Sequence, residues 1–178
     1  CDSARGEKTH RGLSDFGTRV VKEMNRQGIM VDLSHASEES FFDAMRVSEL
    51  PIVCSHSNCK SLCDVPRNLS DEQLRALAKS GGVAQTTLYH GFLRQNGTAT
   101  IEDAVAHLEV MGIEHVGLGT NFDGDGGVSG FADASEAINF TIRLLRKRYS
   151  ERDIALIWGG NWLRVMEQVQ NKRNQQPR

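Results

Sequence analysis

Four short apolar runs, separated by segments with helical periodicity, constrain the fold of this chain more than any other feature. The runs are residues 29–33, 51–56, 82–89 and 115–121. Because short apolar strands joined by helices pair in parallel, the sequence predicts an α/β fold. A doubly wound sheet and part of a (β/α)8 barrel both fit this pattern. A complete barrel needs about 250 residues and eight strands, so four strands match half of one.

Capping signals indicate where the helices between these runs begin and end. Gly28 is placed to stop a helix whose apolar positions begin at Phe16. Ser37 can cap the next helix, and two acidic residues follow it in the first turn. Ser70 and Gln73 have the spacing of a capping box. The helices are therefore expected to alternate with the strands along the chain.

The chain contains no linker or low-complexity segment, so residues 1–170 are expected to form one domain and residues 171–178 a flexible polar tail. Its last helix, residues 151–170, is interrupted by two glycines, and Asn161 can recap it. With a net charge of −2, the chain lacks the basic character expected of a nucleic-acid-binding protein. No run of 18 apolar residues predicts a membrane span, and no targeting signal is recognisable.

Polar residues follow each predicted strand, at the end where function gathers in both architectures. His35 and His56 follow the first two strands, 21 residues apart, and one tight βα unit fits this interval. Since parallel strands lie about 4.8 Å apart, the two imidazoles can share one metal ion. Two hydrogen-bonded polar residues are an equally weighted alternative. Two histidines do not complete a metal site, so a carboxylate or further histidine must come from elsewhere.

Arg67 and two aromatic residues are further candidates for a binding site. Arg67 lies eleven residues after His56 in the same strand-end loop. Spacing alone favours a solvated arginine, and the functional alternative is a bidentate clamp on a substrate carboxylate or phosphate. Tyr89 and Phe92 follow the third strand, where they either line a substrate pocket or pack in the core.

The stretch GLGTNFDGDGG, residues 117–127, has three possible interpretations. As an EF-hand loop it would place Ala132 where a bidentate glutamate is required. As a phosphate-binding G-x-G-x-x-G loop it would place Phe122 where the third glycine is required. Both interpretations fail, and the stretch is best explained as the catalytic rim of a barrel, with Asn121 and Asp123 at the strand end.

Five stretches of the chain are informative when taken together: IMVDLSHAS, VCSHSNCKSLCDVPRN, GVAQTTLYHGF, HVGLGTNFDGDGG and GGNWLRVMEQV. They resemble the second half of a membrane dipeptidase, a renal-dipeptidase-like zinc peptidase of the amidohydrolase superfamily. The resemblance extends from about Cys1 to Val169 and is greatest to bacterial members that are secreted, periplasmic or lipid-anchored. It implies the C-terminal half of a (β/α)8 barrel, with two Zn²⁺ per complete barrel, that hydrolyses dipeptides by a metal-bound hydroxide.

The resemblance also implies roles for individual residues. His35 and His56 would bind the second zinc ion, and Arg67 would hold the free carboxylate of a dipeptide. Asn121 stands where the family has the aspartate that manages the proton of the attacking water. An amide cannot act as a general base. The alternative function is therefore a catalytically inactive homologue, or an engineered knockout, that binds metal and dipeptide without cleavage.

The remaining zinc ligands, including the bridging glutamate, belong to the N-terminal half of the family's barrel. The chain begins at Cys1 without methionine, which predicts a processed chain or a fragment. A half-barrel would also expose two sheet edges, which proteins normally avoid. We therefore expect the other half to be supplied by a second chain or a missing segment, and we expect a homodimer.

Overall fold

The sheet of this protein is parallel, as the alternation of elements predicts. The computed structural model describes residues 1–174 and contains strands β1 (Val53–Cys54), β2 (Val83–Thr86) and β3 (Val116–Leu118), in the order β1-β2-β3. The strands pair in parallel, with β2 between the other two. The four predicted strands are thus shorter than expected, and three of them form the regular sheet.

The first predicted strand is present only as an extended segment beside β1. Asp32 forms a single parallel bridge with Val53. The N–H of Leu33 donates to the Val53 carbonyl at 2.9 Å, and the N–H of Val53 donates to the Val31 carbonyl at 3.0 Å. The four strand ends therefore lie side by side in chain order, which places their following residues at one edge of the fold.

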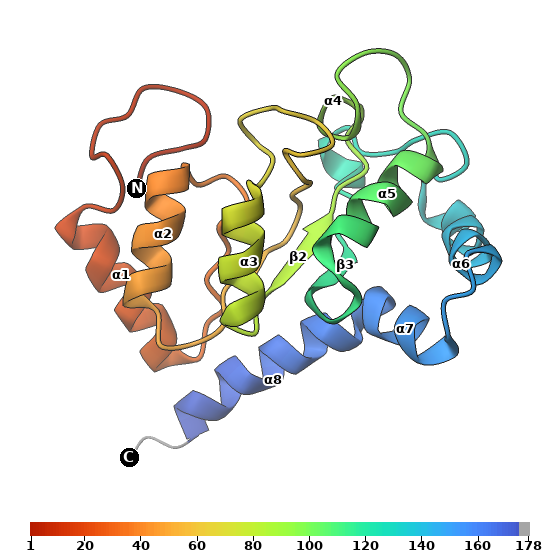
Figure 1. Ribbon diagram of the computed structural model, residues 1–178. Helices are drawn as coiled ribbons and strands as arrows, with labels where there is room; N and C mark the ends of the chain where they lie inside the picture. Colours follow the sequence, from red (N-terminus) through yellow and green to blue (C-terminus); the bar gives the residue numbers. More distant parts are fainter. Residues whose placement is uncertain (175–178) are drawn as a thin grey trace.

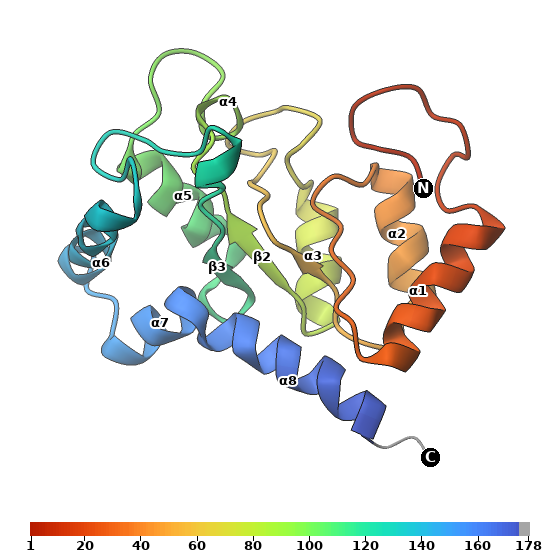
Figure 2. The ribbon, with the colours of Figure 1, turned by 180° about the vertical axis from the view of Figure 1, so that it is seen from behind.

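Helices connect the strands and cover the sheet (Figures 1 and 2). They are α1 (Asp15–Gln27), α2 (Glu38–Val47), α3 (Asp71–Lys79), α4 (His90–Leu93), α5 (Ile101–Met111), α6 (Ala137–Arg146), α7 (Glu151–Ala155) and α8 (Asn161–Asn174). Figure 1 shows α2, α3 and α5 side by side along one face of the sheet, while α8 crosses beneath it. Helix α8 contacts α1, β2 and β3, so it packs against both the first helix and the sheet.

Both faces of the sheet are buried, as is usual for parallel strands. Ile52 and Cys54 point into the main core, which contains the apolar residues of α2, α3 and α5. Val53, between them in sequence, points to the opposite face and packs with Val165 and Val169 of α8. This alternation of side chains lets two-residue strands contribute to both layers.

The local signals for helix ends are confirmed. The Ser37 hydroxyl accepts from the Ser40 N–H at 3.2 Å, and Ser70 and Gln73 form both bonds of the predicted capping box. Gly28 ends α1 with φ of 70°, a left-handed conformation that glycine adopts without the steric cost of a Cβ. These ends depend on contacts within one turn of helix, which is why sequence predicts them well.

The predicted interruption of the C-terminal helix is confirmed, because a π-helical turn at Leu156–Gly160 separates α7 from α8. Two other features differ from the prediction. The Asn161 side chain does not recap the helix. It instead donates to the carbonyls of Ile113 and Val116 at 2.6 and 2.8 Å. Residues 171–174, expected in a flexible tail, extend α8, where Lys172 pairs with Glu49. Residues 175–178 lie outside the described part of the chain.

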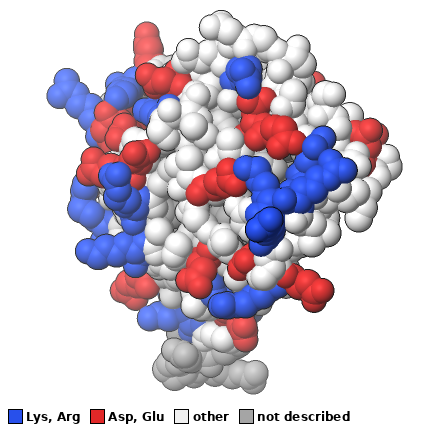
Figure 3. Space-filling model, turned by 45° about the vertical axis from the view of Figure 1, so that its right-hand side comes forward, with Lys and Arg blue, Asp and Glu red and all other residues white. Residues whose placement is uncertain are grey.

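Charged side chains of both signs are mixed over the surface. On the face drawn in Figure 3, basic and acidic side chains lie next to one another. Between α5 and α6, for example, Arg143 pairs with Glu102 at 3.1 Å and Lys147 with Glu109 at 2.8 Å. Among the described residues, no helix has both the length and the apolar character that crossing a membrane requires.

Candidate active site

The strand ends of the sheet border one cavity of about 430 Å³. Six residues singled out from the sequence line this cavity, whereas Asp123 does not, and three further residues complete the lining. The lining residues are Ser3, Arg5, His35, His56, Arg67, Tyr89, Phe92, Asn121 and Gly124. Residues that lie far apart in the chain therefore form a single pocket at the end of the sheet where function is expected.

The two predicted histidines face each other in this cavity. The Nε2 atoms of His35 and His56 are 2.8 Å apart, and the ring centroids are 4.9 Å apart. His35 lies in the turn before α2, and His56 is the second residue after β1. Neighbouring parallel segments thus bring the two rings together, as the spacing of one βα unit predicts.

A chain of hydrogen bonds orients His56. The Ser55 hydroxyl donates to Asp32 Oδ2 at 2.5 Å and lies 2.7 Å from His56 Nδ1. Since that hydroxyl proton is directed at the carboxylate, Ser55 Oγ accepts from Nδ1–H of His56. The proton on Nδ1 leaves the Nε2 lone pair free and directed at His35. Ser34 supports the arrangement, because its hydroxyl donates to Asp32 and accepts from the His56 N–H.

Both imidazoles are held in the neutral form. Burial lowers the pKa of His35 and of His56, and the nearby charge of Arg67 lowers both further. Burial raises the pKa of Asp32, but hydrogen bonds from Ser55 and Ser34 outweigh it, so the net pKa is lowered. Neutral imidazole is the form that binds metal ions, while the ionised carboxylate fixes the orientation of the ligand.

Arg67 is buried beside the histidines, with a surface exposure of 4%. Its Nη2 donates to the His56 carbonyl at 3.3 Å, whereas its buried Nη1 has no hydrogen-bond partner among the described residues. Burial lowers the pKa of Arg67, but a guanidinium remains charged at any physiological pH. A buried cation with a free donor is costly unless an anion binds there. The solvated arginine favoured by spacing alone is therefore wrong.

The aromatic candidates form one wall of the cavity. The rings of Tyr89 and Phe92 have centroids 4.5 Å apart, and the guanidinium carbon of Arg67 lies 5.3 Å from the centre of the Phe92 ring. Phe92 lies on α4 and is 8% exposed. The wall is apolar apart from the Tyr89 hydroxyl, so it suits the side chain of a small ligand.

Asn121 also lines the cavity, in the glycine-rich stretch. Its backbone is left-handed, with φ of 60°, and its carbonyl accepts from the N–H groups of Gly124 and Gly126 at 2.9 and 2.8 Å. A Cβ on Gly126 would lie 2.1 Å from the Thr120 carbonyl oxygen, and one on Gly119 would lie 1.8 Å from that of Ser55. Glycines in this stretch thus allow close backbone contact at the rim of the cavity.

The N-terminal loop supplies lining residues that sequence reasoning did not identify, Ser3 and Arg5. The buried carboxylate of Asp2 accepts from the N–H groups of Thr9, His10 and Gly12 at 2.9 to 3.1 Å. These bonds, that of His10 first, lower the Asp2 pKa to about 2, so the loop is anchored by an ionised group. The apolar residues of this loop follow neither a helical nor a strand periodicity. The sequence therefore gives no indication that the loop reaches the pocket.

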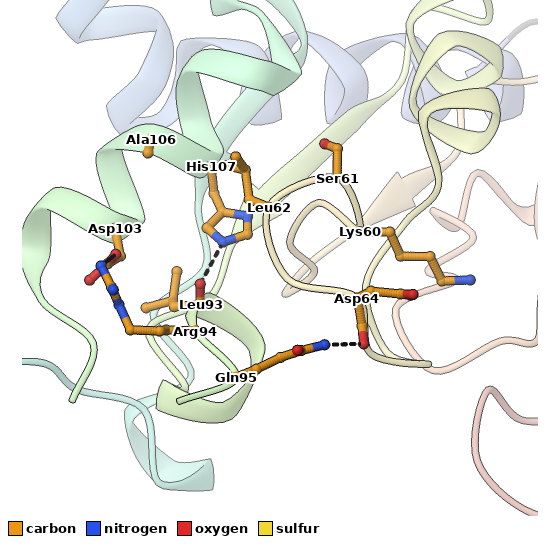
Figure 4. Close-up of a pocket in the computed structure, with 10 residues that line it drawn as sticks. All are labelled: Lys60, Ser61, Leu62, Asp64, Leu93, Arg94, Gln95, Asp103, Ala106 and His107. Carbon is orange, nitrogen blue, oxygen red and sulfur yellow. Dashed lines mark hydrogen bonds and ion pairs between the residues drawn. The ribbon is translucent and has the colours of Figure 1, made fainter. Parts of the chain in front are cut away.

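A second cavity, of about 450 Å³, lies near α5 (Figure 4). Four of its polar side chains, those of Arg94, Gln95, Asp103 and His107, already have partners. Arg94 pairs with Asp103 at 2.5 Å, and Gln95 donates to the Asp64 carbonyl. His107 accepts from the Cys59 N–H and donates to the Leu93 carbonyl, so it has a fixed structural role. This cavity is the weaker candidate for a binding site.

The residues present fit part of a metal site. Two histidine nitrogens bound to one tetrahedral zinc lie about 3.3 Å apart, so the His35–His56 pair needs only a small opening to act as two ligands. Within residues 1–174, no group of three or more His, Cys, Asp and Glu could hold a metal ion. The remaining ligands would have to come from outside this part of the chain.

A parallel α/β fold whose strand ends bring neutral imidazoles and a buried arginine with a free Nη1 into one cavity is typical of metal-dependent hydrolases. The chain belongs to the membrane dipeptidase family, peptidase family M19, whose sequence model matches residues 1–178. This result confirms the resemblance drawn from the five sequence stretches. The roles that the resemblance gives to His35, His56 and Arg67 stay predictions.

Two curated relatives are informative. The chain is 39% identical over 176 residues to an uncharacterised dipeptidase of Schizosaccharomyces pombe, covering 94% of this chain and 42% of that protein. It is 38% identical over 167 residues to mouse dipeptidase 3, covering 91% of this chain and 34% of that protein. The chain thus spans between a third and a half of the length of these relatives.

Solved structures show the same fold. The probable dipeptidase PvdM from Pseudomonas aeruginosa superposes with a TM-score of 0.93 at 27% identity, covering 96% of this chain and 60% of PvdM. A metallo peptidase from Rhodobacter sphaeroides, solved with a phosphinate mimic of the dipeptide L-Ala-D-Ala, superposes with a TM-score of 0.85 at 32% identity. That match covers 90% of this chain and 48% of the peptidase.

Proposed function

We propose that this chain forms the C-terminal half of a zinc-dependent dipeptidase barrel. The observation that carries the proposal is the cavity where the neutral His35–His56 pair lies beside buried Arg67 with a free Nη1. Membership of the family supports a metallopeptidase that acts on dipeptides. The assembled protein, meaning this chain with the segment or chain that supplies the other half, hydrolyses the peptide bond.

The outer surfaces of the fold support the need for a second half. Phe16 and Ile29, near the first edge of the sheet, are 67% and 51% exposed. Ile138 and Leu145 of α6, near the other end, are 61% and 52% exposed. Apolar surface beside open sheet edges favours a covering partner. The N-terminal half of the barrel would cover both of these apolar surfaces. A second copy of this chain is the alternative partner. We further propose that the parent protein is secreted, periplasmic or lipid-anchored at the cell surface, and its family supports this proposal.

The roles of the cavity residues follow from their chemistry. His35 and His56 are the ligands that this chain contributes to a metal ion. Bound zinc ions would lower the pKa of the attacking water and polarise the peptide carbonyl. Arg67 binds the free carboxylate of the dipeptide through its unpaired donor, and Tyr89 and Phe92 contact the side chains while limiting access of bulk water.

The amide of Asn121 limits the rate of hydrolysis expected at this site. It can orient water or substrate but cannot accept a proton from an attacking water. An inactive protein that binds metal and dipeptide is therefore the second candidate function. The specific observation in its favour is that Asn121 lines the cavity and that no Asp or Glu does so among the described residues.

The first prediction tests whether Arg67 binds the substrate carboxylate. Arg67→Met in the assembled protein is expected to lower kcat/KM for Ala–Ala by about 10- to 100-fold, since a hydrogen bond to a charged group is lost. Zinc content should stay unchanged. Steady-state kinetics on Ala–Ala and on its C-terminal amide measure the effect.

The amide provides the internal comparison, because it has no carboxylate for Arg67 to bind. It should be a poor substrate of the unmodified protein and should lose little activity in the variant. Arg75→Met, at an exposed position of α3, is the matched control and should behave as wild type. Equal losses for the dipeptide and its amide would contradict the role given to Arg67.

The second prediction concerns the hydrogen bond that orients His56. Ser55→Ala removes the acceptor of its Nδ1–H and a donor to Asp32, so the imidazole loses its fixed orientation. Zinc affinity is expected to fall by about 10- to 100-fold, as for other residues that orient metal ligands. Competition with a chromogenic chelator measures the affinity without turnover. Ser61→Ala, at an exposed position, is the control. Equal zinc affinity of the two variants would show that Ser55 does not orient the metal ligand.

A further inference from the structure

Arg5 brings a second guanidinium to the cavity that contains Arg67. The guanidinium carbons of Arg5 and Arg67 lie 5.2 and 5.3 Å from the centre of the same Phe92 ring. Both arginines line the cavity, and none of its described lining residues is an aspartate or glutamate. Two cations share one small pocket without a carboxylate from the described chain among its lining residues. Such a pocket favours a ligand with two negative charges.

The loop that carries Arg5 is attached to the site itself. The N–H of Ala4 donates to the His35 carbonyl at 2.8 Å, and Ser3 forms an antiparallel bridge with Ala36. The N–H of Ser37 donates to the Asp2 carbonyl at 2.9 Å. These contacts fix the backbone of residues 35–37 against residues 2–4. The position of Arg5 is thus coupled to that of the metal-ligand histidine.

Arg5 has no acidic partner within residues 1–174, whereas Lys8, three residues later in the loop, pairs with Glu39. Its guanidinium lies over an aromatic ring, which holds a cation while leaving its N–H donors free. An arginine that is held at a pocket wall without a carboxylate is prepared to bind one from a ligand.

We propose that Arg5 is a specificity-determining residue that favours dipeptides with an acidic side chain on the C-terminal residue. The inference rests on the proposed dipeptidase function, in which Arg67 binds the C-terminal carboxylate. Because each guanidinium carbon lies within 5.3 Å of one ring centre, the two cations are close enough to bind two carboxylates of a single substrate residue, and we assign both to the C-terminal residue. A C-terminal aspartate carries both, and asparagine is its neutral isostere.

The test compares ligands that the assembled, zinc-loaded protein cannot cleave. They are reduced-bond analogues of Ala–Asp and Ala–Asn, in which a methylene group replaces the scissile carbonyl. Calorimetric titration should show that the Asp analogue binds about tenfold more tightly than the Asn analogue, the size expected for one charge-assisted contact partly exposed to solvent. Arg5→Gln should reduce this preference to less than about twofold, mainly by weakening the binding of the Asp analogue.

Arg11→Gln is the matched control, because Arg11 is an exposed arginine of the same loop that does not line the cavity. It should retain the preference for the Asp analogue. Equal affinity of both analogues for wild type, or a preference that survives Arg5→Gln, would overturn the inference while leaving the dipeptidase function intact. Failure of both analogues to bind wild type would refute the dipeptide site, and the inference with it.

Discussion

Asn121→Asp is expected to raise kcat/KM for dipeptides by about 10²–10⁴-fold, the usual contribution of a general base. Asn121 already lines the cavity that contains His35 and His56, so the new carboxylate would lie where a proton must be accepted. Its left-handed backbone, with φ of 60°, suits aspartate nearly as well as asparagine. The one side-chain contact that is lost is a long 3.4 Å bond to the Gly124 carbonyl. Steady-state kinetics on the assembled, zinc-loaded protein measure the gain.

Asp123→Asn is the control for this experiment. Asp123 lies two residues further along the same stretch, is exposed and does not line the cavity. Its loss should change kcat/KM by less than about twofold, since a general base must reach the proton that it removes. If Asn121→Asp binds a dipeptide analogue but gains no turnover, the protein is a binding protein and not an enzyme.

The parts of this fold that the sequence predicts well are those decided locally. Ser37 and the pair Ser70 and Gln73 cap their helices through bonds that span three residues. The meeting of His35 and His56 is also predictable, because one βα unit is nearly a fixed length and parallel strand ends share an edge. Local rules and one topological rule are sufficient for these features.

The parts that the sequence does not predict depend on tertiary contacts. Asn161 was expected to cap α8, but it binds the carbonyl of Val116, 45 residues away. Arg5 reaches the cavity only because Asp2 anchors an irregular loop against the turn that contains His35. The burial of Arg67 could not be read from its spacing to His56, since burial depends on Phe92 and the surrounding fold. Irregular segments have no hydrophobic periodicity. The sequence therefore does not show which part of the fold they contact, and only the structure does.

His35→Ala and His56→Ala are each expected to lower the zinc content of the assembled protein from about two ions to about one. Each variant removes one of the two facing imidazoles, and the single histidine left cannot replace the pair. In wild type, burial keeps both rings neutral and able to bind metal near neutral pH. Loss of one metal should lower kcat/KM by about 10³-fold or more, because charge stabilisation and activation of water are lost together.

Plasma emission spectrometry of the purified variants measures the zinc content, and dipeptide kinetics measure the rate. His10→Ala is the matched control, because His10 is exposed and does not line the cavity; it should retain both ions and full activity. Two zinc ions in His35→Ala and in His56→Ala would mean that the 2.8 Å contact is only a hydrogen bond between histidines. That outcome would move the metal site elsewhere and leave Arg67 as the main evidence for a ligand at this cavity.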